Sequence, residues 1–212
     1  MSKKVFIKTF GCQMNEYDSD KMADVLGAAQ GYVPTQDVEE ADLILFNTCS
    51  VREHAEDRVW SSLGCLKKAK NDRPELVIGV MGCMAKAQRE LIFKRAPYVD
   101  FISGPAQMYD VPELVRSIHE ERRPMRAIQE KSRPEFQLVS HHSGKVTALV
   151  TIMEGCSKVC SYCIIPYTRG PEMSRPPDQV IEEVRRLGRA GFKEVMLLGQ
   201  NVNSYGRGLT PA

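Results

Sequence analysis

Leu43-Ile44-Leu45-Phe46-Asn47-Thr48-Cys49 is a short, mostly apolar run that ends in a cysteine. A continuous apolar run of this length is typical of a strand buried on both faces of a parallel sheet. The same pattern occurs upstream in Val5–Cys12 and downstream in Val77–Cys83. Helix-like stretches separate the three runs, so the sequence predicts parallel β-α-β units in a doubly wound α/β sheet.

The first domain is expected over residues 1–120, from the alternation of strand-like and helix-like segments. We expect strands at 5–10, 43–46, 76–81 and 99–102, and helices at 15–29, 51–70, 85–95 and 112–120. From 121 to 144 this alternation stops, and Pro124, Pro134 and the pair His141-His142 indicate a linker. These boundaries predict a linker between two domains.

A second domain is expected to begin at residue 145 and to be incomplete at residue 212. Its predicted elements are a buried strand at 146–153, a helix at 177–190 and a strand at 195–198. Two strands and one helix cannot bury their own apolar faces. We therefore expect the start of a β/α barrel or sheet, and a chain that is a fragment of a longer protein.

Three cysteines, Cys12, Cys49 and Cys83, each follow a predicted strand. The carboxyl ends of parallel strands share one edge of a sheet, so these side chains are expected to converge on one site. The alternative is three buried cysteines used for packing, because cysteine is often interior. Their recurrence at three strand ends favours a shared metal cluster with one open iron. Cys65 lies within a predicted helix, where packing is the expected role.

A second trio is found in the run Gly155-Cys156-Ser157-Lys158-Val159-Cys160-Ser161-Tyr162-Cys163. This C-x3-C-x2-C spacing in a loop suits three corners of a cubic iron–sulfur cluster, with one iron left open to chelate a substrate or cofactor. A thioredoxin-type redox pair at Cys160 and Cys163 is an alternative. A zinc site that adds His141 or His142 is another.

Composition is that of a globular protein whose cysteines are kept reduced. Seven cysteines, an odd number, without a secretory signal favour metal ligation in a cytoplasmic setting over disulfides. The net charge of +2 neither demands nor excludes a nucleic-acid partner. No apolar run approaches the length of a membrane span. There is also no G-x-G-x-x-G motif and no Walker A motif, which excludes the usual nucleotide fingerprints.

Residues near the second trio are weaker candidates. Tyr162 and Tyr167 flank it and either line a nucleobase or adenosine pocket or serve as ordinary loop packing. Arg169 and Arg175 are possible phosphate or carboxylate ligands, but arginines are common on surfaces. His54-Ala55-Glu56 matches the H-x-E of zinc deaminases, although Val159 stands where those enzymes carry proline. We attribute that match to chance.

Six motifs together resemble the methylthiotransferase family over nearly the whole chain. They are Thr9–Ser19, Asn47–Arg52, Gly82–Ala85, Gly155–Cys163, Pro166–Arg175 and Gly199–Gly206. Gln13-Met14-Asn15 after the first cysteine resembles the branch that acts on isopentenyl-type adenosine in tRNA. Branches acting on a ribosomal-protein aspartate or on threonylcarbamoyl-adenosine usually carry Pro-Lys-Asn or Lys-Val-Asn there.

The resemblance implies a radical S-adenosylmethionine enzyme with two [4Fe-4S] clusters. Cys156, Cys160 and Cys163 would hold the cluster that binds S-adenosyl-L-methionine and cleaves it, and the resulting radical would take hydrogen from C2 of the adenine. Cys12, Cys49 and Cys83 would hold the cluster that delivers the methylthio group. Tyr162, Gln200 and Asn201 would contact S-adenosylmethionine. The second domain would then be the truncated start of a radical-SAM barrel.

The resemblance also implies partners and a location. The enzyme would modify N6-isopentenyl-adenosine beside the anticodon of tRNA and take electrons from a donor protein. It would act in the cytoplasm as a monomer that does not associate with a membrane. Family members continue into further barrel strands and an RNA-binding domain, so this chain alone is expected to be inactive. The alternatives are a ribosomal-protein or threonylcarbamoyl-adenosine substrate, or a non-catalytic module that holds metal and binds a partner.

Overall fold

The structure, a computed structural model, describes residues 2–50, 53–121, 125–127 and 146–209. The chain divides into two compact units, Met1–Pro134 (unit 1) and Glu135–Ala212 (unit 2). The pair His141-His142, the motif residues Val51 and Arg52, and most of the predicted linker lie outside the described residues. Among the residues that are described, no helix is long and apolar enough to cross a membrane.

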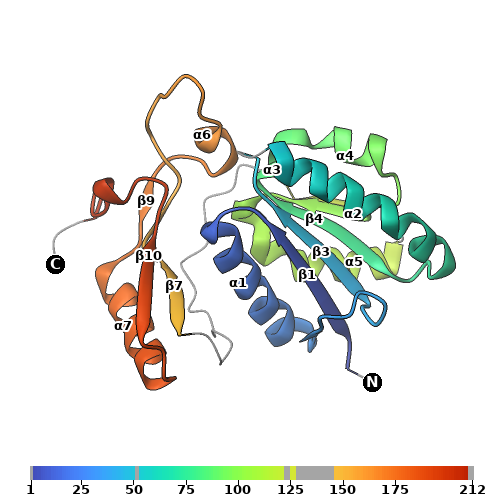
Figure 1. Ribbon diagram of the computed structural model, residues 1–212, viewed down its shortest axis with the longest axis horizontal. Coiled ribbons are helices and arrows are strands. Elements are labelled where there is room, and N and C mark those ends of the chain that lie inside the picture. The colour runs from blue at the N-terminus through green and yellow to red at the C-terminus, as the bar shows by residue number, and fades with distance from the viewer. Residues whose placement is uncertain (1, 51–52, 122–124, 128–145, 210–212) are drawn as a thin grey trace. The chain divides into compact units, whose positions relative to one another are not determined.

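Unit 1 is built on one six-stranded sheet in which every pair of neighbouring strands is parallel (Figure 1). In their order across the sheet the strands are β2 (Val33–Pro34), β1 (Lys4–Phe10), β3 (Leu43–Thr48), β4 (Val77–Gly82), β5 (Phe101–Ser103) and β6 (Met125–Ala127). This confirms the predicted α/β class with a parallel sheet.

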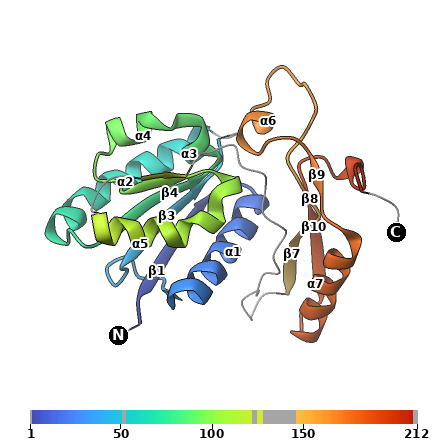
Figure 2. The ribbon, with the colours of Figure 1, turned by 180° about the vertical axis from the view of Figure 1, so that it is seen from behind.

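Helices cover both faces of this sheet, as Figures 1 and 2 show from opposite sides. The helical elements of unit 1 are α1 (Gln13–Gln30), α2 (Glu53–Asp72), α3 (Cys83–Gln88), α4 (Glu90–Arg95), the 3-10 helix η1 (Pro105–Asp110) and α5 (Val111–Glu121). One core packs α2, α3 and α4 against the sheet, and the other packs α1, η1 and α5. The sheet is therefore doubly wound.

The buried strand β3 explains how the sequence specifies both cores. All six of its residues are buried, and successive side chains point to opposite faces. Ile44 and Phe46 belong to the core under α2, whereas Leu43 and Leu45 belong to the core under α1. Phe46 also stacks on Phe10 of β1, with ring centroids 6.3 Å apart. Both faces are apolar because both are covered, which removes the polar–apolar alternation of a half-exposed strand.

The strand order reverses direction between β1 and β3. From β1 the chain passes through α1 to β2 on one side, then returns to β3 on the other side of β1 and continues to β4 and β5. In open parallel sheets, ligands bind in the crevice beyond the carboxyl ends of the strands at such a switch point. Cys12 and Cys49 follow the two strands that flank this point.

Unit 2 contains one β-α-β element and a small antiparallel pair. The strand β7 (Thr147–Thr151) lies parallel to β10 (Glu194–Leu198). The helix α7 (Pro177–Arg189) lies between these two strands in the sequence. Val180, Val184 and Leu187 of α7 pack onto the core beside β7. The remaining elements are β8 (Met153–Glu154), α6 (Ile165–Thr168), β9 (Met173–Ser174) and the 3-10 helix η2 (Val202–Ser204).

Several local predictions differ from the structure. The single helix expected over 85–95 is two helices, because Arg89 adopts φ 38° between α3 and α4. Residues 125–127, expected in a linker, form the edge strand β6 beside β5. Cys65 does lie in α2, but its side chain is exposed, so the predicted packing role is wrong.

Candidate functional site

The three cysteines of unit 1 follow three adjacent strands at one edge of the sheet. Phe10 of β1 pairs with Thr48 of β3, and Thr48 pairs with Gly82 of β4. Cys49 and Cys83 come directly after the paired residues Thr48 and Gly82, and Cys12 comes two residues after Phe10. The sheet therefore brings Cys12, Cys49 and Cys83, here called the unit-1 trio, to the same edge despite their separation in sequence.

Two glycines allow the strand ends of the unit-1 trio to approach closely. A Cβ placed on Gly11 would lie 2.9 Å from the Cβ of Cys49 and 2.4 Å from Oδ1 of Asn15. A Cβ placed on Gly82 would lie 2.5 Å from Oδ1 of Asn47 and 2.8 Å from the carbonyl oxygen of Thr48. All four distances are shorter than real Cβ contacts, so a side chain at either position would displace its neighbours. Gly82 also has φ 91°, a conformation that glycine alone adopts readily.

A buried amide pair lies beneath these loops. Asn15 donates from Nδ2 to Oδ1 of Asn47 at 3.0 Å. Asn47 donates from Nδ2 to the backbone oxygen of Asn15 at 2.8 Å and to Oγ of Ser19 at 3.0 Å. Oδ1 of Asn15 in turn accepts the backbone N–H of Cys12 at 3.4 Å. Hydrogen bonds of this kind satisfy polar groups that would be costly to bury alone.

A second link joins the segments that follow Cys49 and Cys83. Ser50 donates its hydroxyl to Oε1 of Glu56 in α2 at 3.0 Å, and Gln88 of α3 donates to Oε2 of the same carboxylate. Ser50 is the residue after Cys49, and Gln88 is the last residue of the helix that Cys83 begins. The carboxylate of Glu56 therefore holds together two of the three chain segments that carry the unit-1 trio.

The unit-1 trio fits an iron–sulfur cluster in chemical kind and in place. All seven cysteines are among the described residues, and none is in a disulfide. Cys49 and Cys83 are 4% and 2% exposed, and Cys12 is half-buried. Within the described ranges no three His, Cys, Asp or Glu side chains lie close enough together to hold a single metal ion. Thiolates are the ligands that iron–sulfur clusters use, so the trio matches a cluster in the type of its side chains.

In unit 2, Cys156, Cys160 and Cys163, here called the unit-2 trio, lie in one loop between β8 and β9 (Figure 1). β8 and β9 pair antiparallel and close the base of this loop. The N–H of Cys156 donates to the oxygen of Gly170 at 3.0 Å, and the N–H of Cys163 donates to the oxygen of Cys160 at 3.0 Å. Cys156 is buried, Cys163 is half-buried and Cys160 is exposed, so the trio opens toward solvent on one side.

The base of this loop is fixed at Gly155. It has φ 75°, and a Cβ there would lie 2.1 Å from the carbonyl oxygen of Pro171. Its N–H donates to Oε1 of Gln200, the second residue after β10, at 2.6 Å. Gln200 thus connects the end of β10 to the start of the cysteine loop. The structure gives this predicted cofactor contact a positioning role on the backbone.

The other predicted cofactor contacts are placed differently. Tyr162 and Tyr167 are 90% and 78% exposed, so neither is packed in the loop. Of the two alternatives for these tyrosines, the exposure contradicts ordinary loop packing, and their rings are accessible to a ligand. Asn201 precedes η2 and donates from Nδ2 to Oγ of Ser204, the last residue of η2, at 2.7 Å. The structure brings Gln200 to the loop base and leaves the two tyrosines on the loop surface.

Arg169 and Arg175, which the sequence suggested as phosphate or carboxylate ligands or else as ordinary surface arginines, are both buried. Arg175 is fully buried and forms an ion pair with Glu183 of α7, and it also donates to the oxygen of Thr151 at 3.3 Å. Arg169 is buried as well. The hydroxyl of Tyr205 donates to the oxygen of Arg175 at 3.0 Å, and burial raises the pKa of that phenol. The ion pair joins the residue after β9 to α7, and the hydrogen bond to Thr151 joins it to β7.

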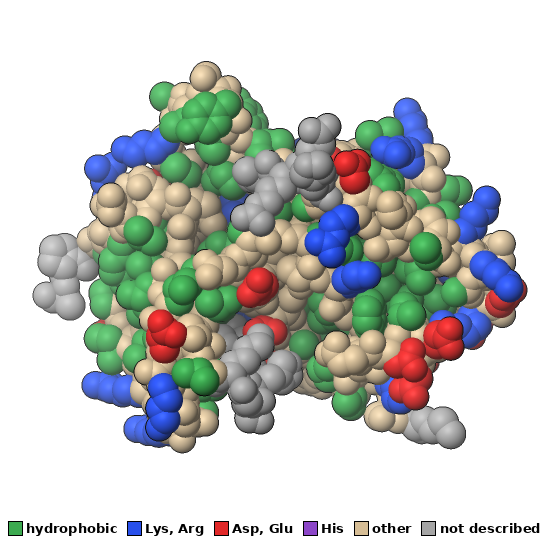
Figure 3. Space-filling model, viewed as in Figure 1, with side chains coloured by type: hydrophobic (Ala, Val, Ile, Leu, Met, Phe, Trp, Pro, Cys, Tyr) green, Lys and Arg blue, Asp and Glu red, His purple; other side chains and the backbone are tan. Residues whose placement is uncertain are grey.

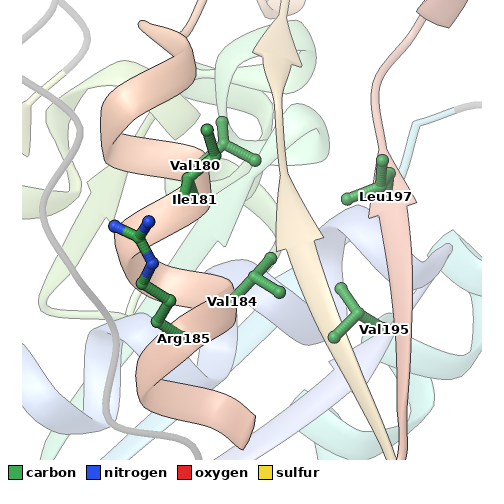
Figure 4. Close-up of a pocket in the computed structure, with 6 residues that line it drawn as sticks. All are labelled: Val180, Ile181, Val184, Arg185, Val195 and Leu197. Atoms are coloured by element: carbon green, nitrogen blue, oxygen red, sulfur yellow. The ribbon is translucent and has the colours of Figure 1, made fainter.

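An apolar cavity of about 420 Å³ in unit 2 lies between α7 and the sheet (Figure 4). Its lining residues are Val180, Ile181, Val184, Arg185, Val195 and Leu197. Figure 4 shows the aliphatic side chains of α7 and β10 that line this space, with the guanidinium of Arg185 directed away. The lining carries no thiol, imidazole or carboxylate, so it offers no metal ligand. Leu197 is half exposed, as expected for two strands that cannot cover their own faces.

Sequence reasoning missed the polar residues that support both trios. Asn47 interrupts an apolar strand two residues before Cys49, and a polar residue inside a run buried on both faces is itself a signal. Glu183 lies on the apolar stripe of α7, three residues after Val180 and four before Leu187. A charge on that stripe requires a buried partner, which Arg175 supplies.

Comparison with known families matches most of the chain in two segments. Residues 4–104 match a family described as Uncharacterized protein family UPF0004. Residues 150–209 match the Radical SAM superfamily. The first segment contains the unit-1 trio and the second contains the unit-2 trio.

Curated relatives resemble the chain along nearly its whole length. It is 57% identical over 209 residues to the tRNA-2-methylthio-N(6)-dimethylallyladenosine synthase of Acidovorax sp. (strain JS42), covering 97% of this chain and 46% of that protein. It is 53% identical over 214 residues to the protein of the same name from Paraburkholderia phytofirmans, covering 99% and 46%. The chain thus spans about half the length of the curated relatives that it matches.

Solved structures support the fold. A radical S-adenosylmethionine methyltransferase from Kitasatospora setae, TsrM, determined with cobalamin and a [4Fe-4S] cluster, superposes with a TM-score of 0.64 at 12% identity. The match covers 96% of this chain and 49% of that one. Two family models thus match separate parts of the chain, and along nearly its whole length it is similar to curated tRNA methylthiotransferases at 53–57% identity.

Proposed function

We propose that this chain is part of a tRNA methylthiotransferase that adds a methylthio group to C2 of N6-isopentenyl-adenosine beside the anticodon. The observation that carries the proposal is the unit-1 trio, which lies at the switch point of a sheet in a chain 57% identical to a protein of that name. Gln13-Met14-Asn15 supports the isopentenyl-type substrate, because it resembles the motif of that branch.

Each trio would hold one [4Fe-4S] cluster. Residues 1–120 would form the domain that holds the cluster of the unit-1 trio, and residues 145–212 the part of the radical-SAM domain that holds the cluster of the unit-2 trio. When bound, the two clusters and S-adenosyl-L-methionine supply the radical and sulfur-transfer chemistry, as cofactors do for reactions that side chains cannot perform. Three protein thiolates per cluster leave one iron open in each.

The residues of unit 2 would orient S-adenosylmethionine. Gln200 holds the N–H of Gly155 and so fixes the loop that carries the unit-2 trio. The exposed rings of Tyr162 and Tyr167 supply faces on which adenosine can stack. Asn201, one residue beyond Gln200, would contact the polar part of the cofactor. These assignments make Gln200 a positioning residue and Tyr162 a contact residue.

The partners follow from the reaction. The substrate would be the anticodon loop of tRNA, and a donor protein would supply electrons to a monomeric enzyme in the cytoplasm. On the face displayed in Figure 3, lysines and arginines are scattered among acidic side chains instead of forming one basic surface. This agrees with the small net charge of +2. Assays of tRNA binding and turnover therefore require the full-length protein.

Nucleoside analysis of tRNA tests the proposal. A strain that lacks the full-length gene should accumulate isopentenyl-adenosine without its methylthio form, and the intact gene should restore that form. Cys12→Ala or Cys156→Ala in the full-length protein should abolish restoration, because each removes a cluster ligand. Cys65→Ala is the matched control and should restore the modification, since Cys65 is exposed on α2. Full restoration of the methylthio form by Cys12→Ala would reject the proposal. So would a deletion strain whose tRNA is unchanged while a ribosomal protein loses its methylthio group.

A further inference from the structure

The buried amide of Asn47 contacts the chain segments of all three cysteines in the unit-1 trio. Asn47 itself lies two residues before Cys49 on β3. Its Oδ1 accepts from Asn15, three residues after Cys12. The same Oδ1 lies where a Cβ on Gly82, the residue before Cys83, would come within 2.5 Å. Asn47 is fully buried, so these contacts replace water completely.

Backbone groups at both ends of this hydrogen-bond chain fix its direction. The carbonyl of Asn15 can only accept, so Nδ2 of Asn47 must face it, and it does at 2.8 Å. Oδ1 of Asn47 then faces Nδ2 of Asn15 at 3.0 Å. That orientation leaves Oδ1 of Asn15 to accept the N–H of Cys12, a group that can only donate. If either side-chain amide were turned by 180°, an oxygen would face an oxygen or an N–H group would face an N–H group.

We propose that Asn47 is the positioning residue of the unit-1 trio: its amide, acting through Asn15, sets the spacing of the loops that carry Cys12, Cys49 and Cys83. The inference rests on the proposed function, because it assigns these loops a cluster to hold. Groups that hydrogen-bond behind metal ligands typically change metal affinity about 10- to 100-fold when removed. Asn47 acts on the loops and not on the iron itself.

Ser19 provides a matched control in the same network. It accepts from Nδ2 of Asn47 at 3.0 Å and lies 2.7 Å from Oγ1 of Thr9. Ser19 is buried like Asn47, but it lies on α1 one turn beyond Asn15. Ser19→Ala therefore disturbs the same polar network without removing a contact to Asn15 or Gly82. A purely structural role of the network predicts the same rate of iron removal for Ser19→Ala and for the uncharged Asn47→Ser.

Iron retention tests the proposal in a chain whose unit-2 trio is replaced by alanine. After anaerobic reconstitution, a chelator should remove iron roughly 10-fold faster or more from Asn47→Asp and from the uncharged Asn47→Ser than from Ser19→Ala. Trp60, the one tryptophan of the sequence, lies on α2 and reports the urea midpoint of unit 1. Equal removal rates in the Asn47 and Ser19 variants would overturn the proposal. Loss of cooperative unfolding in both Asn47 variants would overturn it as well, because Asn47 would then serve the fold.

Alkylation of the iron-free protein separates this inference from the proposed function. In both Asn47 variants iodoacetamide should modify Cys49 and Cys83 roughly 10-fold faster than in Ser19→Ala, because the loops that bury these thiols lose their common tie. Unchanged alkylation rates would reject the inference whatever the iron content. If the parent chain takes up no iron at the unit-1 trio while the alkylation rates change as expected, the proposed function fails and the positioning role stands.

Discussion

The two trios are assembled in opposite ways. The unit-1 trio comes from three separate strands and is gathered by the pairing of β1, β3 and β4. The unit-2 trio lies within one loop whose base is closed by β8, β9 and the hydrogen bond between Gly155 and Gln200. The first depends on tertiary structure and the second on local structure. A change that weakens the sheet should therefore disturb the unit-1 trio and spare the other.

Burial follows the same division. Cys49 and Cys83 are buried next to a network of amides and a carboxylate, whereas Cys160 is exposed. A largely buried site supported by hydrogen bonds suits a cluster whose ligands are held at fixed positions. An exposed loop suits a cluster that must admit a cofactor from solvent. The following substitutions test this contrast, from the largest expected effect to the smallest.

Gly82→Ala should destabilise unit 1 by about 4 kcal/mol, from a strained φ together with overpacking against Thr48 and Asn47. The urea midpoint followed by Trp60 fluorescence should fall accordingly. Gly64→Ala is the control, because no atom lies within 4 Å of a Cβ at that exposed position in α2. An unchanged midpoint for Gly82→Ala would show that the strand ends are not as closely packed as described.

Glu183→Ala should destabilise unit 2 by about 3 kcal/mol, because it leaves the guanidinium of Arg175 buried without its carboxylate. Hydrogen exchange of β7 and α7 should accelerate, while the Trp60 transition of unit 1 stays the same. The neighbouring Glu182→Ala is the control, since its contact with Arg186 is 3.8 Å long and exposed. A shift of the Trp60 midpoint in Glu183→Ala would show that the effect of this ion pair is not confined to unit 2.

Ser50→Ala should lower the free energy of unfolding of unit 1 by about 1 kcal/mol, because it removes the hydrogen bond to Glu56 and one hydrogen bond typically contributes that much. Iron bound by the unit-1 trio should then be lost to a chelator faster than in the parent, and iron at the unit-2 trio should be lost at the parental rate. Ser61→Ala, an exposed position on α2, is the control. Equal loss from both trios would mean that the link between Ser50 and Glu56 has no local role.

Cys65→Ser should leave the iron content unchanged. It should change the free energy of unfolding by no more than about 0.5 kcal/mol, as expected for an exposed position on a helix. Iron analysis and the Trp60 midpoint measure both. A drop in iron content would place Cys65 among the cluster ligands, and the division of six cysteines into two trios would be wrong.

Much of the fold was predictable because buried parallel strands leave a plain signal. The apolar runs that end at Cys12, Cys49 and Cys83 predicted the strands, and the shared edge of a parallel sheet follows from topology alone. The short pair β8–β9 was not predictable, because two-residue strands carry no periodicity. The break at Arg89 was missed too, since nothing in Ala85–Arg95 marks a residue with positive φ.

Side-chain partners were the least predictable part of the candidate site. Arg175 and Glu183 are eight residues apart, and only the packing of α7 on β7 shows that they meet in the interior. The tie between Asn15 and Asn47 joins residues 32 positions apart. Such contacts depend on register and packing, which a single sequence does not specify. Cys65 illustrates the converse, because its helix was predictable but its orientation toward solvent was not.

Iron and sulfide analysis of the reconstituted chain tests the two-trio account most directly. The account predicts about eight irons per chain, falling to about four when either trio is replaced by alanine and to none when both are replaced. A chain that keeps all its iron without Cys12, Cys49 and Cys83, or that retains zinc in place of iron, would contradict it.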